Sequence, residues 1–352
     1  MTRDYSQFFP TTPTAAQALR PPSPLTALGW QPFFAQQTSV EEMAETPPCR
    51  VIAVHRNGLQ VRGAEIETVV PTGPDATVGD WLLYDMARPG DSRVLARKSL
   101  IARRAPGQDR RRQMIAANLE TAFVTSSCNA DFNVARLERY IALALEADVA
   151  PVIVLTKADL AEDVTTYVDR AGAISDLVPV VALDARAGAP VDKLAAWCKL
   201  GQTVAFLGSS GVGKSTLTNA LVVGADAPTQ EIREDDAKGR HTTTRRQLHL
   251  VPGGCAVLDT PGMRELQLAD VAAGVEALFS DLEALADQCR FNDCAHETEP
   301  GCAVSAAVAR GEVDAARLAR WRKLAAEDRF NAATLAERRS RDRAFGKMVR
   351  RI

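Results

Sequence analysis

Residues 208–215 have the glycine content and the spacing of a loop that binds phosphate groups. They read GSSGVGKS and stand between the apolar run TVAFL and the stretch TLTNAL, which indicates a strand, a loop and a helix in succession. The backbone N–H groups of such a loop point into one concavity, and the start of the helix adds positive potential. We expect Lys214 to reach the β- and γ-phosphates of a nucleotide and Ser215 to bind Mg²⁺ through its hydroxyl. The expected nucleotide-binding residues of this segment are Gly208, Ser209, Ser210, Gly211, Val212, Gly213, Lys214, Ser215 and Thr216.

A second apolar run, CAVLD, ends at Asp259 and is followed by Thr260, Pro261 and Gly262. We expect Asp259 to hold Mg²⁺ through water and the N–H group of Gly262 to meet the γ-phosphate. Asp-x-Pro-Gly by itself is also ordinary turn chemistry. Its place after the phosphate loop, at the end of a strand, favours the nucleotide site.

The polar segment 231–247 between these motifs shows no periodicity, so it is predicted to be a mobile loop. Thr243 is its expected Mg²⁺ ligand when a triphosphate is bound, although the threonines on either side fit the same role. Many GTPases place a Gln directly after DxxG to orient the attacking water, and Met263 stands there instead. We therefore predict slow hydrolysis without a partner. The expected catalytic residues are Lys214, Thr243 and His241, with a plain surface histidine as the alternative for His241.

The tetrad TKAD at residues 156–159 indicates that the base is guanine. Guanine presents a ring N–H and an amino group together, and Asp159 can accept both, whereas adenine does not offer that pair. A site built on such bonds rejects the wrong base because its own polar group would stay unpaired. We expect Lys157 to pack its stem along the base. Thr156 replaces the commoner Asn, which weakens the expected local bracing.

The next predicted strand ends in ALDA, where Ala185 is expected to offer its N–H group to the guanine oxygen. Asp184 departs from the usual Ser-Ala pair at this place. The TKAD tetrad has an alternative explanation as the start of a helix, with Asp159 as its N-terminal carboxylate.

The order of these motifs is unusual. Ordinary small GTPases run from the phosphate loop to DxxG and then to [NT]KxD, whereas here the base-reading tetrad comes first. A circular permutation explains this order, because it keeps the site and moves the chain ends. The segment that senses the γ-phosphate then leads directly into the C-terminal region.

A metal site is predicted near the C-terminus. Cys289, Cys294, His296 and Cys302 lie within a short segment, and three thiolates with one imidazole suit a closed, structural tetrahedral Zn²⁺. A disulfide is the rival interpretation, which a cytoplasmic location disfavours. The remaining cysteines are expected to be small core residues.

Four regions follow from the patterns. Residues 1–46 are rich in Pro and are predicted to be a flexible leader, within which LGWQPFF is apolar enough to dock on a neighbour. Residues 47–110 predict a small antiparallel barrel of the OB type, or another small β-domain, with a hairpin at Asn57-Gly58. Residues 111–275 alternate strands and helices, which is typical of a doubly wound α/β sheet with its ligands at the carboxyl ends of the strands. Residues 276–352 predict a zinc-binding helical domain with a basic tail.

The overall composition is that of a soluble globular protein. Lys plus Arg number 42 and Asp plus Glu 44 in 352 residues, so the net charge is −2 and any contact with nucleic acid must use local patches. Residues 93–112 and the tail from residue 338 are such basic segments, with a solvated face as the alternative. No apolar run approaches the roughly 18 residues of a membrane helix. We expect a cytoplasmic monomer.

Together these motifs resemble the ribosome small-subunit-dependent GTPase A (RsgA) family of circularly permuted GTPases. The resemblance covers about residues 49–330 and rests on stretches such as IAANLETAFVTSS, PVIVLTKADL, GSSGVGKSTLTNAL, GRHTTTR, DTPGMREL and HETEPGCAV. It implies an OB-fold, a permuted GTPase core and a zinc-bearing helical domain. It also implies late maturation of the bacterial 30S subunit, with contacts to 16S rRNA and GTP hydrolysis stimulated by the ribosome.

Two alternatives stay open on the sequence alone. Met263 permits a nucleotide-sensing, RNA-binding regulator with negligible turnover. An ATP-dependent enzyme that uses the same phosphate loop is the other.

Overall fold

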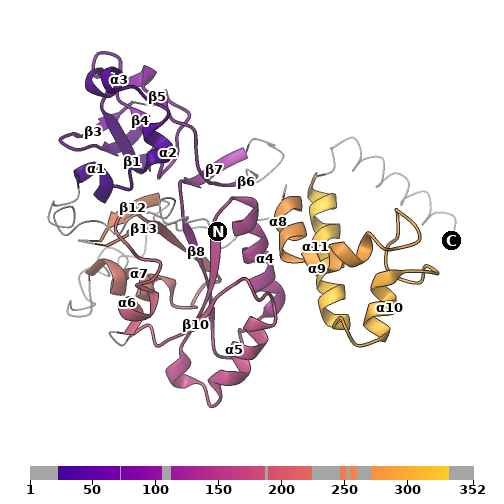
Figure 1. Cartoon of the computed structure of the whole chain (residues 1–352). Coiled ribbons are helices and arrows are strands. Elements are labelled where there is room, and N and C mark those ends of the chain that lie inside the picture. Colours follow the sequence, from indigo (N-terminus) through magenta and orange to yellow (C-terminus); the bar gives the residue numbers. More distant parts are fainter. Residues whose placement is uncertain are drawn as a thin grey trace, which may run out of the picture.

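The computed structural model describes residues 23–71, 73–104, 112–186, 189–223, 246–251, 254–259 and 271–332. An N-terminal group of strands, a central α/β layer structure and a C-terminal group of helices follow one another along the chain (Figure 1). None of the described helices combines the length and the apolar character that crossing a bilayer requires.

The central sheet confirms the predicted α/β fold. Its strand order is β10-β9-β8-β11-β13-β12, and all neighbours pair in parallel except β12 with β13. The strands are β8 (Thr121–Ser127), β9 (Ala150–Thr156), β10 (Val180–Ala182), β11 (Thr203–Gly208), β12 (Arg246–Leu250) and β13 (Ala256–Asp259). The parallel strands end at one edge of the sheet, where such folds bind their ligands.

Helices cover both faces of this sheet (Figure 1). Side chains alternate along each strand, so Val124 and Ile153 pack with α4 (Val134–Glu146) and α5 (Val164–Gly172), whereas Phe123 and Val154 pack with the opposite helices. Those opposite helices are α6 (Ala189–Leu194) and α7 (Lys214–Val223). Apolar runs that are buried on both faces explain why the strands lack the alternating polar residues of a one-sided sheet.

The N-terminal strands extend the same sheet. β1 (Pro48–His55) pairs antiparallel with β2 (Gly58–Arg62), β4 (Trp81–Leu83) and β12, so β1 joins this region to the core. The predicted hairpin is confirmed, with His55 opposite Gly58. β3 (Glu67–Val70) and β5 (Arg93–Val94) complete the region. β6 (Leu100–Arg104) and β7 (Arg112–Ala117) form a separate two-stranded ribbon.

The prediction of a flexible leader is wrong from residue 23 onward. Three short helices form there: α1 (Pro24–Ala27), α2 (Pro32–Ala35) and α3 (Val40–Glu45). Leu28 and Phe34 are buried, and the ring of Trp30 lies edge-on to Trp81 at 4.8 Å between centroids. The expected docking of the LGWQPFF stretch is therefore confirmed, and its apolar burial is what orders the segment.

Arg50 is a fully buried cation where the leader, the N-terminal strands and the core meet. Its guanidinium donates to the carbonyl of Leu28, to that of Gly79 and to Thr203 Oγ1, the last at 2.8 Å. Burial lowers the pKa of Arg50 to about 10, which still leaves it charged at neutral pH. The side chain therefore links three segments that are distant in sequence.

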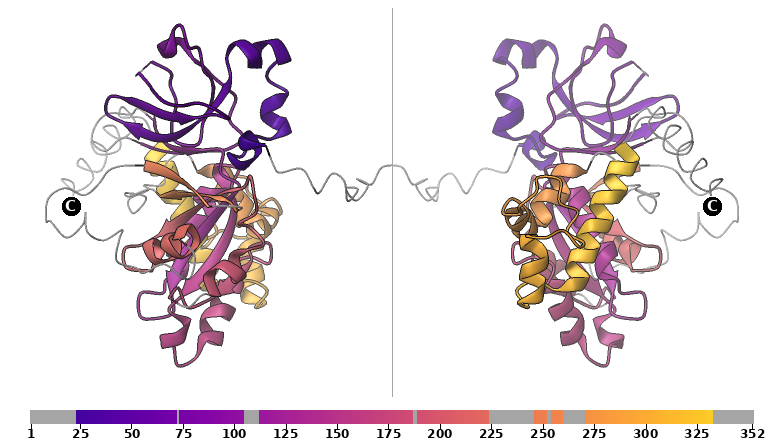
Figure 2. Two further views of the ribbon diagram at one scale, coloured as in Figure 1. Left: turned by 90° about the vertical axis from the view of Figure 1, so that its left-hand side faces the viewer. Right: turned by 90° about the vertical axis from the view of Figure 1, so that its right-hand side faces the viewer.

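The C-terminal helices, orange to yellow in Figure 2, lie against one side of the central α/β region, where the first of them packs on α4. They are α8 (Ala272–Leu278), α9 (Ser280–Ala286), α10 (Ala303–Ala309) and α11 (Ala315–Ala332). At Gly274 an added Cβ would lie 1.9 Å from the carbonyl oxygen of Ala142, so only glycine permits this close approach of α8 to α4. Two ion pairs join α4 to α11, Glu138 with Arg320 and Arg139 with Glu327.

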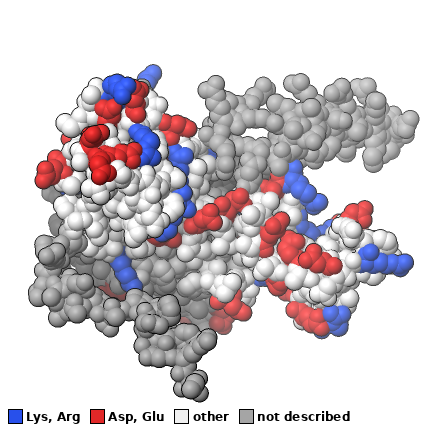
Figure 3. Space-filling model, turned by 45° about the horizontal axis from the view of Figure 1, so that its top comes forward, with Lys and Arg blue, Asp and Glu red and all other residues white. Residues whose placement is uncertain are grey.

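The basic segment 93–112 is partly neutralised within the fold. Arg93 pairs with Glu42, and Arg97 with the buried carboxylate of Asp80 at 2.8 Å. Lys98 lies 3.4 Å from Glu120. On the face seen in Figure 3, basic and acidic side chains are intermixed. In the described part of this segment, these three cations therefore serve internal contacts, and the tail from residue 338 lies outside the described residues.

Candidate functional site

The loop between β11 and α7 has the backbone that its glycines predict. Gly208 has φ 147°, and an added Cβ would lie 2.3 Å from the carbonyl oxygen of Thr125, so no other residue fits there. The Lys214 ammonium donates to the carbonyls of Gly208, at 2.8 Å, and Ser209. Ser210, Gly211 and Ser215 are exposed, whereas Val212 is buried and Gly213, Lys214 and Thr216 are half-buried. The loop thus presents its backbone and one cation at the carboxyl edge of the sheet.

One hydrogen bond joins the phosphate loop to the TKAD tetrad. Thr156 is fully buried, and its hydroxyl donates to the carbonyl of Val212 at 2.7 Å, across 56 positions in sequence. Thr156 Oγ1 also lies 3.2 Å from the carbonyl of Ser126. Thr156 therefore braces the phosphate loop.

The rest of the tetrad turns out of the sheet at the same edge. Lys157 adopts the left-handed conformation with φ 57°, which starts the short helix η3 (Ala158–Leu160) and leaves Asp159 exposed. The neighbouring loop after β10 lies close, since the N–H group of Ala158 reaches the carbonyl of Leu183 at 3.4 Å. The Asp159 carboxylate is therefore open to a ligand.

The two predicted nucleotide-binding residues in the loop after β10 differ in their surroundings. Asp184 Oδ1 accepts from the N–H group of Arg186 at 2.8 Å, so this carboxylate stabilises its own turn. Ala185 is buried, at 8% exposure. The unusual aspartate thus has a local structural role.

Three predicted site residues, His241, Thr243 and Gly262, lie outside the described residues. Asp259 is the last residue of β13, next to the strand that leads into the phosphate loop, but its side chain is not described. The structure therefore brings the backbone of Asp259 to the same edge as Lys214 and Thr156.

The structure shows a contact to the phosphate loop that the sequence does not predict. Arg136, in the first turn of α4, donates from Nη1 to Ser209 Oγ at 2.8 Å. Tyr140, one turn further along, is buried and also interacts with Ser209. The pattern of α4 indicates only an amphipathic helix, and the positive residue at its start is the one available signal.

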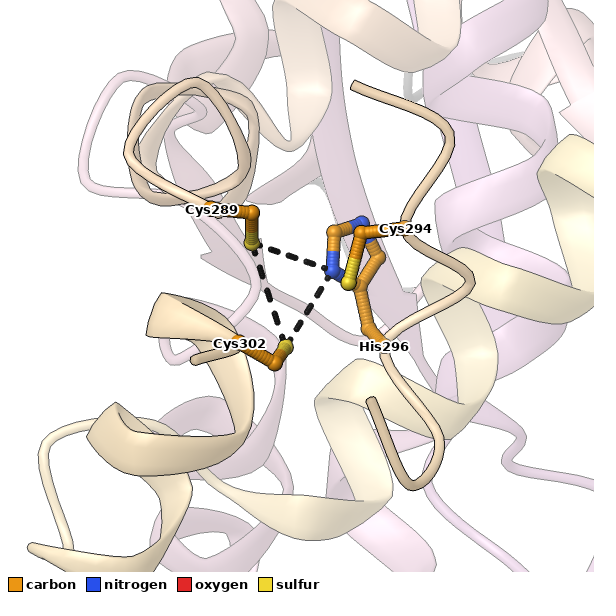
Figure 4. Close-up of side chains that lie close together, drawn as sticks. All are labelled: Cys289, Cys294, His296 and Cys302. Atoms are coloured by element: carbon orange, nitrogen blue, oxygen red, sulfur yellow. Dashed lines mark hydrogen bonds between the residues drawn. The ribbon is translucent and has the colours of Figure 1, made fainter. Parts of the chain in front are cut away.

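The four predicted metal ligands converge (Figure 4). Their ligand atoms all lie within 4.8 Å of one another. His296 Nδ1 is 3.6 Å from the sulfur of Cys289 and 3.5 Å from that of Cys302, and these two sulfurs are 3.9 Å apart. Such a Cys₃His cluster can hold a metal ion.

Neighbouring groups fix the orientation of these ligands. The His296 ring stacks on Trp321 at 5.2 Å, and Trp321 Nε1 donates to Glu283. Cys302 caps α10 and accepts from the N–H group of Ser305. Burial opposes ionisation of this thiol, but the bonds from Ser305 and from His296 outweigh it and lower the pKa of Cys302 to about 6. The cluster is thus supported by its surroundings in the way that metal sites commonly are.

Comparison with known proteins decides the family. The model of the RsgA GTPase family matches residues 94–269. The chain belongs to the RsgA GTPase family. It is therefore a GTP-hydrolysing enzyme, and the open alternatives of a regulator without turnover and of an ATP-dependent enzyme fall away.

Relatives match almost the whole chain. The small ribosomal subunit biogenesis GTPase RsgA 2 of Vibrio parahaemolyticus is 49% identical over 333 residues, covering 94% of this chain and 93% of that protein. The corresponding RsgA of Mesorhizobium japonicum is 48% identical over 335 residues, covering 93% and 96%.

Two solved structures share the fold. YjeQ from Thermotoga maritima is 28% identical with a TM-score of 0.58, covering 79% of this chain and 96% of that one. YloQ, described as a circularly permuted GTPase, is 23% identical with a TM-score of 0.55, covering 82% and 96%. The predicted circular permutation of this RsgA family member is therefore confirmed.

Proposed function

We propose that this protein binds GTP at the carboxyl edge of the central sheet, hydrolyses it to GDP and phosphate, and acts in late maturation of the 30S ribosomal subunit, which stimulates the hydrolysis. The observation that carries the nucleotide site is the Thr156–Val212 hydrogen bond, which ties the base-reading tetrad to the phosphate loop. The printed names of the relatives, small ribosomal subunit biogenesis GTPases, support the ribosomal role.

Each motif takes one task in this proposal. Asp159 accepts from the guanine ring N–H and amino groups, and Lys157 packs along the base. Lys214 leaves its loop carbonyls for the β- and γ-phosphates, and the N–H groups of residues 208–216 surround them. Ser215, Asp259 and Thr243 serve Mg²⁺, which neutralises charge on the phosphates when bound. Gly262 senses the γ-phosphate, and His241 orients the water.

The Cys₃His cluster fits Zn²⁺. Tetrahedral zinc with Zn–S bonds of about 2.3 Å and Zn–N bonds of about 2.0 Å separates its sulfurs by about 3.8 Å and sulfur from nitrogen by about 3.5 Å. The separations of 3.9, 3.6 and 3.5 Å among Cys289, His296 and Cys302 agree with those values. Four protein ligands leave no open position, so the ion would be structural.

The contacts with 16S rRNA belong to the flanking regions in this proposal. The N-terminal antiparallel strands form the OB-type barrel, which together with the zinc domain holds the RNA. The internal pairing of Arg93 and Arg97 leaves the residues after 103 and the tail from 338 as the main phosphate-binding segments. Loss of the γ-phosphate of GTP then releases the 30S particle. The protein acts as a monomer in the cytoplasm.

The experiment is a GTPase assay on purified protein with and without 30S subunits, combined with co-sedimentation. We expect stimulated turnover, and tighter 30S binding with a non-hydrolysable GTP analogue than with GDP. The variant Lys214→Ala serves as the control without nucleotide binding. Absence of stimulation by 30S subunits would remove the ribosomal role, and equal 30S affinity with both nucleotides would remove the switch.

A further inference from the structure

Ser209 of the phosphate loop is held from two sides. The Lys214 ammonium donates to its main-chain carbonyl, and the Arg136 guanidinium donates to its hydroxyl at 2.8 Å across 73 positions in sequence. A bound nucleotide draws Lys214 away toward the phosphates, since that is the task of the lysine in such loops. The contact from Arg136 is made to the side chain of Ser209 and leaves the backbone N–H groups of the loop free for a nucleotide, so it can persist.

The position of Arg136 is itself fixed. Asn133 caps α4, and its side chain accepts from the N–H group of Arg136 at 3.0 Å. Two residues further on, both carboxylate oxygens of the fully buried Glu138 lie 2.8 Å from Nε of Arg320 in α11. Arg139 makes a two-pronged pair with Glu327, at 2.7 and 2.5 Å. One turn of α4 thus contacts the phosphate loop on one side and the C-terminal helices on another.

Tyr140 lies beside the same contact. Burial raises the pKa of its hydroxyl, so this group stays protonated and neutral beside Ser209. Arg136 and Tyr140 are one helical turn apart and therefore share a face of α4. They line a small hollow between α4 and the loop together with Asn133, Thr125 and Ser209.

We propose that Arg136 is a positioning residue for GTP hydrolysis. It holds the phosphate loop at Ser209 and thereby positions the backbone N–H groups of the next loop residues to bind the γ-phosphate. Donors that are already in place stabilise transition-state charge without reorganisation, so their loss lowers kcat more than it weakens binding. GDP has no γ-phosphate and depends little on this contact. The inference rests on nucleotide binding by residues 208–215.

The test compares Arg136→Ala, Arg136→Lys, Ser209→Ala and the double variant Arg136→Ala/Ser209→Ala in single-turnover hydrolysis, with GDP affinity measured by competition. We expect Arg136→Ala to lower kcat about tenfold, the loss of one hydrogen bond to a charged group. KM and GDP affinity should stay within about twofold, and Arg136→Lys should recover part of the rate. Ser209→Ala should match Arg136→Ala, and the double variant should be no slower than either.

Arg88→Ala is the matched control, because its side chain is 75% exposed and, among the residues that the structure describes, forms its ion pairs with Asp85 and Asp91 at the surface. A kcat of Arg136→Ala within about twofold of the parent, additive effects of the two single variants, or equal losses of GTP and GDP affinity would each overturn the proposal. Failure of the proposed function is a separate result, since the parent protein itself would then not hydrolyse GTP.

Discussion

Removal of Arg320 tests how the C-terminal helices are fixed to the GTPase core. Glu138 is fully buried, and both its oxygens accept from the Nε of Arg320 at 2.8 Å, while Arg320 is 24% exposed. Removing one partner of a buried ion pair costs about 3–5 kcal/mol, because it leaves a charge buried without compensation. Partial exposure of Arg320 places Arg320→Ala near the lower limit, at about 3 kcal/mol.

The destabilisation caused by Arg320→Ala is expected to depend on pH. Burial raises the pKa of Glu138, and Arg320 lowers it, so Arg320→Ala raises this pKa further. The folded variant then binds more protons than the unfolded chain between the ordinary and the raised pKa, and its stability falls as pH rises through that window. The destabilisation should therefore be larger at pH 8 than at pH 5. Glu138→Gln in the Arg320→Ala background should recover part of it, since a neutral amide replaces the charge.

Hydrogen exchange in α4 and α11 measures the local opening free energy without assuming that the whole chain unfolds in one step. Arg310→Ala is the control, because Arg310 and Glu312 are both more than half exposed and such surface pairs contribute little to stability. A loss for Arg320→Ala no larger than for this control, or an equal loss at both pH values, would refute the reasoning.

Three further changes test other parts of the molecule. Asp159→Asn should shift nucleotide preference from GTP toward XTP in hydrolysis assays, and unchanged use of GTP would exclude base recognition by this residue. Cys302→Ser should lower the zinc content below one ion per chain in elemental analysis and raise hydrogen exchange in α10, whereas retention of a full equivalent would contradict the ligand assignment. Arg50→Ala should cost at least about 3 kcal/mol in urea unfolding, because it empties a buried site and orphans several acceptors, and Arg50→Lys should not restore it. A lysine variant as stable as the parent would show that the planar guanidinium is not needed.

The sequence was informative wherever chemistry depends on short spacing. The phosphate loop, the TKAD tetrad and the Cys₃His cluster are each confined to a few residues, and a strand end followed by glycines or polar groups predicts where they lie. The parallel core was predictable for a similar reason, because strands buried on both faces are apolar throughout.

Features that depend on distant partners were not predictable in this way. The Pro-rich leader is ordered from residue 23 because Trp30 and Phe34 pack against Trp81. The residues around Trp30 and Phe34 in the sequence do not indicate this distant partner. The contact from Arg136 to Ser209 is hidden for the same reason. The pairing of Arg97 with Asp80 is likewise not predictable from composition, because composition gives the charge of a segment but not whether its side chains face solvent or an internal partner.

The pairing of β1 with β12 has a consequence for how this protein can be dissected. Val54 pairs with Arg246 and Ala53 with Gln247, so the N-terminal region supplies the strand that pairs with β12 of the catalytic unit. In a fragment that begins after β7, β12 would be an exposed edge strand with unpaired N–H and C=O groups. Such an edge can pair with a second copy of the chain. The catalytic unit is therefore not a detachable module, and protein prepared for biochemistry should retain the chain from residue 23.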